Sequence, residues 1–147
     1  MYYRIEVYVL IAIVAILIGV LLWNAGRYPF LIIQKSPKGG RGVYANIYFK
    51  KGSIIEICPL LISKNRKLGD AVTNYSFNYE TIKKDHGAIA LGYGSLYNHN
   101  DNPNAEYEVR YQKLVIKAVR DIRPGEEIFI SYGDDWWTTR NMHKVTD

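Results

Sequence analysis

The stretch Leu96–Tyr107, LYNHNDNPNAEY, decides how the rest of this chain is interpreted. Asparagine stands at positions 98, 100, 102 and 104, beside His99 and Pro103. A calcium loop needs several carboxylates and a closing bidentate glutamate, whereas only Asp101 and Glu106 are acidic here. Two interpretations of the stretch remain: a tight turn, or part of an active site. Short amide side chains favour turns, and they also offer a donor and an acceptor to a ligand.

Composition limits the classes of protein that the sequence allows. The chain has 147 residues, of which 48% are hydrophobic, so it is long enough for one modest packed domain. Cys58 is the only cysteine, which excludes an intramolecular disulfide and a cysteine zinc cluster. The three histidines are far apart in the sequence and lack flanking ligands. We therefore expect no metal site.

An uncharged apolar run, Val7–Trp23, precedes the polar part of the chain, and Ile5 and Ala25 extend it. A cleaved signal peptide would have a shorter apolar run and a small-residue cleavage site. A buried core helix of this length would be unusual in so small a domain. About 17–25 apolar residues span a bilayer as a helix. We therefore expect residues 5–25 to form a single transmembrane helix.

The charged residues that flank this run predict its orientation. Arg4 stands alone before it, whereas Arg27, Lys35, Lys38 and Arg41 follow it. Because basic flanks favour the cytosolic side, we expect a single-pass protein of a viral or host-cell membrane, with its C-terminal domain in the cytosol. The formal net charge of +5 falls on that domain, so its surface should attract acidic lipid headgroups or nucleic acid.

Residues 28–140 are expected to form one mostly β domain of the α+β class, followed by a short tail over 141–147. The alternation of residue types in Tyr75–Tyr79 and Ala105–Tyr111 is typical of half-buried strands. Turn signals, such as the Pro-Gly pair in Asp121–Glu126, separate the apolar runs. The expected strands cover residues 30–34, 43–45, 54–63, 75–79, 88–91, 105–111, 114–119 and 127–133.

Turn chemistry leaves three segments unexplained: SPKGGRGVYA (36–45), LYNHNDNPNA (96–105) and GEEIFISYGDDWW (125–137). In this order they resemble the SET domain of protein-lysine methyltransferases, and the C-terminal SYGDDWW resembles the tail of compact viral SET proteins. The likeness runs from about Leu31 to Trp137. The matching residues are Gly40-Arg41-Gly42, Asn98-His99 with Pro103-Asn104, and Gly125-Glu126-Glu127 with Tyr132.

The resemblance implies a SET-domain β-fold with a pseudoknot-like crossing, in which the C-terminal strand passes under a loop. It implies S-adenosyl-L-methionine as cofactor and places Tyr132 at the methyl-transfer centre. Tyr75 and Trp136 would line the substrate-lysine channel, and Trp137 would cover the adenine ring. The roles of the two tryptophans could also be exchanged. The residues expected along the cofactor are Lys38, Gly40, Arg41, Gly42, Asn98, His99 and Trp137.

The chemistry of methyl transfer to lysine explains why such a site needs aromatic walls. The attacking amine must be neutral, but the pKa of lysine in water is about 10.4. A narrow apolar channel disfavours the charged form of the amine, and fixing the amine in line with the methyl group supplies much of the rate. The chain has 13 tyrosines and three tryptophans from which such walls can be built.

The leading hypothesis is therefore a membrane-anchored protein-lysine methyltransferase that uses S-adenosyl-L-methionine. Its substrate would be a protein that presents a lysine, such as a histone tail, with no direct readout of nucleic acid and with pairing between two copies of the chain. A second hypothesis is a catalytically silent SET-like module that binds a basic peptide at a membrane. A third is a basic module that holds nucleic acid near a membrane, for which the only support is the net charge of +5.

Overall fold

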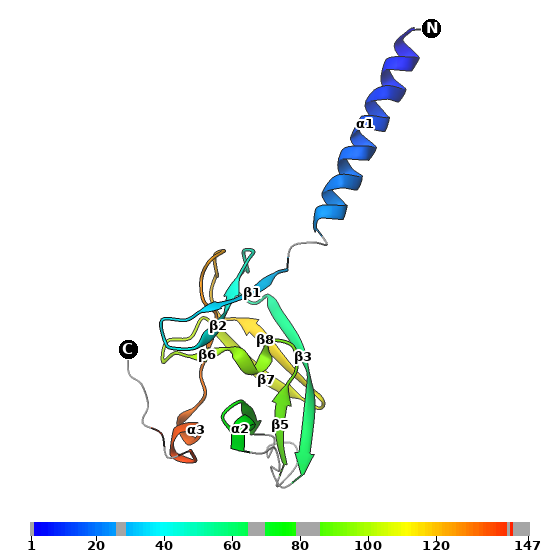
Figure 1. Cartoon of the computed structure of the whole chain (residues 1–147). Coiled ribbons are helices and arrows are strands. Elements are labelled where there is room, and N and C mark those ends of the chain that lie inside the picture. The colour runs from blue at the N-terminus through cyan, green and yellow to red at the C-terminus, as the bar shows by residue number, and fades with distance from the viewer. Residues whose placement is uncertain (1, 26–28, 65–69, 79–85, 141, 143–147) are drawn as a thin grey trace. The chain divides into compact units, whose positions relative to one another are not determined.

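The computed structural model describes all residues except 1, 26–28, 65–69, 79–85, 141 and 143–147. The chain divides into two compact units, Met1–Phe30 and Leu31–Asp147 (Figure 1). The tail expected over residues 141–147 lies outside the described residues, apart from Met142.

The first unit contains one helix, α1, which covers Tyr2–Ala25. Helix α1 includes the whole of the helix expected over residues 5–25. The apolar side chains described from Val7 to Leu21 are largely exposed. A helix that is apolar on every side normally buries that surface in protein or lipid. Among the residues that the structure describes, no helix is both long enough and apolar enough to be assigned as a membrane span, so the expected span is not confirmed.

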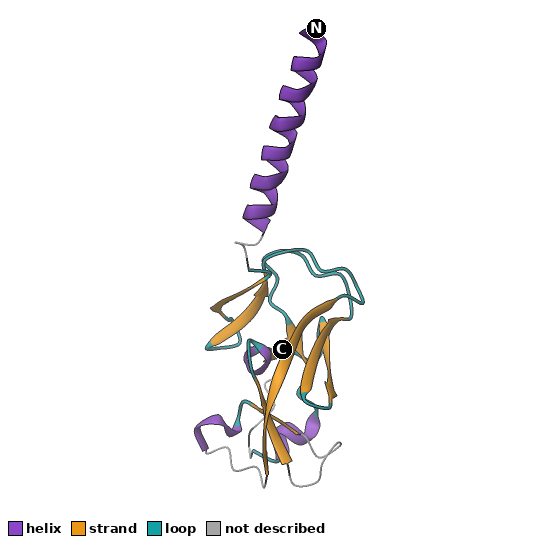
Figure 2. Ribbon diagram, turned by 90° about the vertical axis from the view of Figure 1, so that its right-hand side faces the viewer, coloured by secondary structure: helices purple, strands orange, loops and turns teal. Residues whose placement is uncertain are grey.

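The second unit consists mainly of short β-strands (Figure 2). A five-stranded sheet has the order β4-β5-β3-β8-β7, in which all neighbours are antiparallel. A separate antiparallel hairpin pairs β1 with β2. The bounds are β1 Leu31–Lys35, β2 Arg41–Ala45, β3 Ile54–Lys64, β4 Ser76–Asn78, β5 His86–Ala90, β7 Ala105–Arg110 and β8 Lys113–Ala118.

A third, two-stranded sheet joins the middle of the chain to its C-terminal part. Strands β6 (Asn98–His99) and β9 (Phe129–Ile130) pair in parallel, with Asn98 opposite Phe129 and His99 opposite Ile130. The amide of Asn100 continues the pairing by donating to the carbonyl of Ile130 at 3.2 Å. The C-terminal segment therefore lies beside the Asn-His pair, as the resemblance implied.

The buried side of the sheets forms one hydrophobic core. Strand β8 contributes Leu114 and Ile116, and the C-terminal segment contributes Ile122, Ile128 and Ile130, all with less than 2% exposure. Burying side chains of this size is the main favourable term in folding, at about 1.5–3 kcal/mol each. The core thereby fixes the C-terminal segment that carries much of the site described below.

Cys58 has the structural role that the sequence suggested. Its side chain is fully buried at the centre of β3, and burial raises the pKa of the thiol to about 12, with the nearby Glu56 adding to the shift. A thiol that remains protonated at neutral pH is a poor nucleophile. Cys58 is therefore a small core residue.

Every strand expected from the sequence has a counterpart in the second unit, which confirms a mostly β fold. The structure adds strand β6 and the short helices α2 (Asp70–Thr73), η1 (Gly94–Leu96) and α3 (Asp134–Thr138). These elements contain between two and five residues. They are too short to produce a periodic pattern of apolar residues, and tertiary contacts rather than local propensity determine them.

Candidate active site

Tyr132 follows β9 and is held by contacts with two residues near β6. Its backbone amide donates to Nδ1 of His99 at 3.2 Å, and its hydroxyl donates to the carbonyl oxygen of Tyr97 at 2.8 Å. Burial is the main reason that the pKa of Tyr132 rises to about 12. The phenol is therefore neutral at physiological pH. Because the Tyr132 hydroxyl donates its proton to the Tyr97 carbonyl, the lone pairs of its oxygen remain available to accept a hydrogen bond from another group.

A cavity of about 450 Å³ lies next to Tyr132. Three of the predicted site residues line it: Tyr75, Tyr132 and Trp136. The sequence did not single out the further aromatic residues in its wall, which are Phe77, Tyr97 and Tyr107. Phe77 and Tyr107 meet edge to face, with ring centroids 5.1 Å apart. The cavity therefore has the aromatic walls that a channel for a neutral amine requires.

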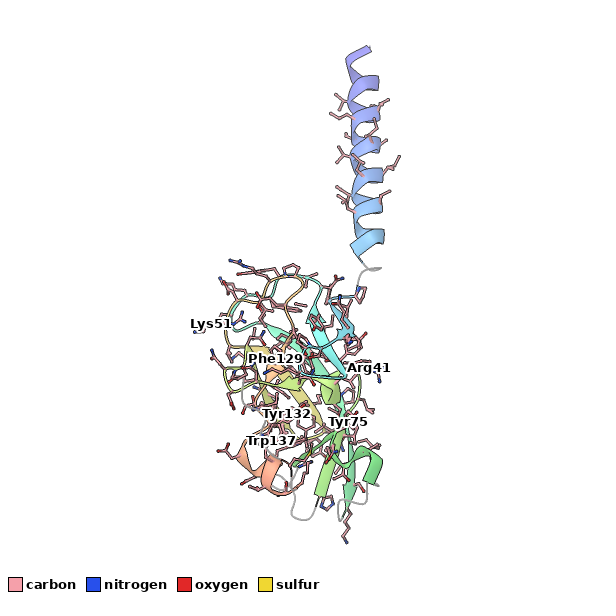
Figure 3. The ribbon with its side chains drawn as sticks, turned by 60° about the vertical axis from the view of Figure 1, so that its left-hand side comes forward. Arg41, Lys51, Tyr75, Phe129, Tyr132 and Trp137 are labelled. Atoms are coloured by element: carbon pink, nitrogen blue, oxygen red, sulfur yellow. The ribbon has the colours of Figure 1, made fainter. Side chains whose placement is uncertain are left out.

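Helix α3 places two tryptophans against Tyr132 and against each other, with the Trp136 and Trp137 ring centroids 4.8 Å apart. The Trp136 ring lies 4.7 Å from that of Tyr132 and lines the cavity. Trp137 does not line this cavity; its ring stacks on Tyr132 at 6.1 Å and meets His99 edge on at 5.1 Å. Figure 3 shows Tyr132 and Trp137 together at the same end of the unit as Tyr75, away from Lys51.

Arg140 joins the C-terminal segment to the opposite wall of the cavity. Its guanidinium lies 4.5 Å from the centroid of the Trp136 ring and donates to the carbonyl oxygens of Thr73 at 2.8 Å and Ser76 at 3.3 Å. The residues of this group that line the cavity are Thr73, Ser76, Trp136 and Arg140. No motif indicated this role, because arginine side chains are mostly solvated.

His99 is oriented by contacts at both ring nitrogens. A backbone amide donates only, so Nδ1 must accept the hydrogen bond from Tyr132, and the proton of a neutral ring lies on Nε2. Nε2 is 3.1 Å from Oδ1 of Asp101, and the His99 side chain is only 8% exposed. His99 thus connects the Asn-rich stretch to the backbone of Tyr132.

Asn98 is the point at which three segments meet. Its Nδ2 donates to the carbonyl of Arg41 at 3.1 Å and to Oε1 of Glu127 at 2.8 Å. Glu127 was recognised only as part of a motif, yet its side chain reaches the β1–β2 hairpin as well as Asn98. The Asn-rich stretch therefore contributes to a site as well as to a turn.

The β1–β2 hairpin carries the other residues that were expected along the cofactor. Lys38, Gly40 and Arg41 are exposed at its turn, where Gly40 has a φ of 62° and its carbonyl accepts from the amide of Ser36. Gly42 is buried, and a Cβ atom there would collide with the Glu127 carboxylate. The space that a side chain at position 42 would need is filled by Glu127, and the expected place of Gly42 along the cofactor stays a prediction.

The predicted site residues thus form two groups that meet at Tyr132. Tyr75 and Trp136 line the cavity on one side. Asn98, His99 and Trp137 do not line the cavity, and they are connected to Tyr132 or to the hairpin. The structure brings the segments together, while the assignment of each residue to cofactor or lysine stays a prediction.

Comparison with known proteins agrees with this arrangement. The family model described as SET domain matches residues 40–133. A curated relative of Schizosaccharomyces pombe, named histone-lysine N-methyltransferase, H3 lysine-37 specific, is 31% identical over 112 residues, which cover 73% of this chain and 76% of the relative. Histone-lysine N-methyltransferase Suv4-20 of Caenorhabditis elegans is 27% identical, over 74% of this chain and 39% of the relative.

A solved structure supports the same conclusion. The crystal structure of a Plasmodium falciparum protein, described as a candidate histone methyltransferase, matches with a TM-score of 0.64 at 35% sequence identity, over 75% of this chain and 98% of that one. The likeness to compact viral SET proteins stays a prediction, since these relatives are from a yeast, a nematode and a protozoan. The sequence match and the shared fold together show that this chain belongs to the SET-domain family.

Proposed function

We propose that the chain is an enzyme that transfers a methyl group from S-adenosyl-L-methionine to a lysine side chain of a protein. The observation that carries this proposal is the position of Tyr132. Its partly buried hydroxyl donates to the Tyr97 carbonyl beside an aromatic cavity, while its backbone amide donates to His99. The relatives named above are histone-lysine methyltransferases or are described as candidates, so a histone tail is the first substrate to test.

On the cavity side, the chain's own residues would desolvate and orient the lysine. Phe77, Tyr107 and Trp136 provide apolar ring surface, which favours the neutral amine over the ammonium. The Tyr132 hydroxyl, whose proton is used on Tyr97, would accept a hydrogen bond from the amine. Accepting that bond fixes the direction of the nitrogen lone pair, and such orientation lowers the barrier to a displacement reaction.

The group formed by Asn98, His99 and Trp137 has polar atoms that fit an amino-acid and nucleoside ligand. Nε1 of Trp137 is buried without a hydrogen-bond partner among the described residues, and Oδ1 of Asn98 has none among them either. An unused buried donor in a protein usually indicates a ligand or a water molecule. When bound, S-adenosyl-L-methionine supplies an electrophilic methyl group; Asn98, His99 and Trp137 would hold it, and Arg41 is a further candidate.

The activity can be tested with the full chain, purified in mild detergent, isotope-labelled cofactor and recombinant histones. Label on a histone lysine, identified by mass spectrometry, is the expected result, and the histone H3 tail is the first region to examine. Cofactor binding without label on any protein would instead favour the silent peptide-binding module. Salt-sensitive DNA binding with no cofactor binding would favour the nucleic-acid module. Either of these last two results would end the proposal.

We also propose that residues 5–25 anchor the chain in a membrane and that the SET domain lies on the cytosolic side. The support is the uncharged run Val7–Trp23 and the basic residues that follow it. After alkaline washing of membranes, the full chain should stay in the pellet, and added protease should digest the SET domain only from the cytosolic side. Replacing Ile13 and Leu17 by arginine should release the chain, whereas replacing Ala12 and Ala15 by serine should not. Release of the unaltered chain would contradict the anchor.

A further inference from the structure

Glu127 is a buried carboxylate that is surrounded by neutral donors. It is 8% exposed, and its Oε2 accepts from the Ser36 hydroxyl at 2.9 Å and from the Tyr44 hydroxyl at 3.0 Å. Its Oε1 accepts from Nδ2 of Asn98 at 2.8 Å. Among the described residues, Glu127 forms no ion pair. Burying a carboxylate in this way is costly unless its hydrogen bonds are well formed, so the arrangement calls for an explanation.

The acceptors around Asn98 determine which way its amide points. Both neighbours of Nδ2, the Arg41 carbonyl and the Glu127 carboxylate, can only accept hydrogen bonds. The NH₂ group must therefore face them, and the carbonyl oxygen Oδ1 must point the opposite way. Among the described residues Oδ1 has no partner. The amide thus presents an acceptor, and never a donor, to a ligand beside it.

The glycine at position 42 is part of the same arrangement. A Cβ atom on Gly42 would overlap the Glu127 carboxyl group and would lie 3.0 Å from Nδ2 of Asn98. The side chains of Glu127 and Asn98 therefore occupy the space that a side chain at 42 would need. Tyr44 stays a neutral donor to this group, because burial and the neighbouring Glu127 carboxylate raise its pKa.

We propose that Glu127 is a positioning residue for the cofactor: it fixes the Asn98 amide so that Oδ1 receives a hydrogen-bond donor of the ligand, such as an ammonium group. This inference rests on the proposed function. The hydrogen bonds of the Glu127 side chain go to the hairpin and to Asn98, and among the described residues none goes to Tyr132. Burial is the main cause of the raised pKa of Tyr132, and the charge of Glu127 is the smallest of its causes. Loss of the carboxylate should therefore weaken cofactor binding and leave the chemistry at Tyr132 largely intact.

The test compares Glu127→Ala with Glu127→Gln and with a matched control, Tyr44→Phe. Glutamine keeps an oxygen that can accept from Asn98, and Tyr44→Phe removes a donor from Oε2 while leaving the bond between Oε1 and Asn98. By calorimetry on the full chain, Glu127→Ala should weaken S-adenosyl-L-methionine binding about 10- to 100-fold, the range expected for a hydrogen bond to a charged group. Glutamine and the control should stay within about threefold.

Steady-state kinetics separate positioning from a merely structural role. The glutamine variant should keep its kcat at saturating cofactor, and any defect should appear in the KM for the cofactor. If folded Glu127→Ala binds the cofactor as the unaltered chain does, the proposal is overturned. A Tyr44→Phe variant that loses as much affinity as Glu127→Ala would also overturn it, because the effect would then not depend on Asn98.

A measurement on the unaltered chain does not depend on any variant folding or on cofactor binding. In ¹⁵N NMR spectra, both side-chain amide protons of Asn98, assigned with Asn98→Ser, should exchange slowly with solvent. Exchange as fast as in exposed asparagines would overturn the proposal even if the cofactor binds. If the unaltered chain does not bind S-adenosyl-L-methionine, the proposed function fails. Slow exchange of the Asn98 amide protons would still support the proposal that Glu127 fixes the Asn98 amide, and fast exchange would contradict it.

Discussion

Tyr132 lies between two regions that are held together in different ways. On one side, buried hydrogen bonds connect the strands: Asn104, which is 2% exposed, donates to the carbonyl of Glu127 and accepts from the amide of Phe129. On the other side, helix α3 is held by ring contacts and by the bonds of Arg140 to the carbonyls of Thr73 and Ser76. The first region is polar and enclosed, and the second is aromatic and partly exposed.

This difference predicts that the two regions differ in rigidity. Breaking a buried hydrogen-bond network leaves polar groups without partners, which is costly, so the region around Asn104 should keep one geometry. Ring contacts and a partly exposed arginine stabilise much less. We therefore expect the aromatic region to open and close at a smaller free-energy cost, as the proposed channel for a protein side chain requires.

The largest expected effect comes from Tyr132→Phe, which alters the residue that both regions share. The ring contacts remain and the hydroxyl is lost, so a lysine amine loses the acceptor that orients it. We expect kcat to fall about 100- to 1,000-fold, as when one such polar contact is removed from other enzymes, while calorimetric cofactor affinity changes less than about threefold. Unchanged turnover would show that the methyl-transfer centre lies elsewhere.

Asn104→Ala tests the polar region alone. It leaves the Glu127 carbonyl and the Phe129 amide without their partner, so the free energy of unfolding should fall by about 2–4 kcal/mol. Urea denaturation followed by tryptophan fluorescence measures this. Asn104→Asp keeps the acceptor for Phe129 and should lose less. A loss below about 0.5 kcal/mol for alanine, a value typical of surface positions, would mean that the polar region is not the more rigid one.

Arg140→Met tests the aromatic region alone. Methionine keeps an apolar stem against Trp136 but cannot donate to the carbonyls of Thr73 and Ser76. We expect kcat/KM for the protein substrate to fall about tenfold, with a change of less than about 1 kcal/mol in unfolding free energy. Arg120→Met, which removes an exposed pair with Glu126, is the matched control and should leave kcat/KM unchanged. A large stability loss for Arg140→Met would erase the contrast between the two regions.

The smallest effect concerns pH. Tyr132 has its pKa raised from 10.0 to about 12, mainly by burial. Folding therefore favours the neutral phenol. The stability that the neutral phenol contributes to the folded state is fully present below pH about 10 and is lost as the pH rises towards about 12. Between pH about 7 and 10, turnover should rise as the substrate lysine loses its proton. A decline below pH about 10 that is absent in Tyr132→Phe would show that the phenol ionises earlier than its burial implies.

The strands of the second unit could be predicted because alternation and turn residues are local signals. The three motifs predicted which distant segments meet, and the structure places Tyr132 beside His99 and Tyr97. The roles of Glu127 and Arg140 could not be predicted, because each depends on partners that are distant in the sequence, at separations of 83 residues to Tyr44 and 67 to Thr73.

Gly42 shows that a glycine singled out for one reason can also be needed for another. The glycine turn suggested an approach of backbone to ligand, and the same composition also satisfies the need to make room for Glu127. Sequence alone does not distinguish these causes, because both require the absence of a side chain. Only the fold shows which group occupies the space.

The parallel pairing of β6 with β9 has a consequence for synthesis on the ribosome. Asn98 finds its strand partner only at Phe129, and the core residues Ile128 and Ile130 lie in the same late segment. A nascent polypeptide would therefore expose unfinished apolar surface until Tyr132 has emerged, and contacts between such distant positions form slowly. We expect chains that stall before this point to be bound by chaperones and proteases, because part of their apolar core is still uncovered.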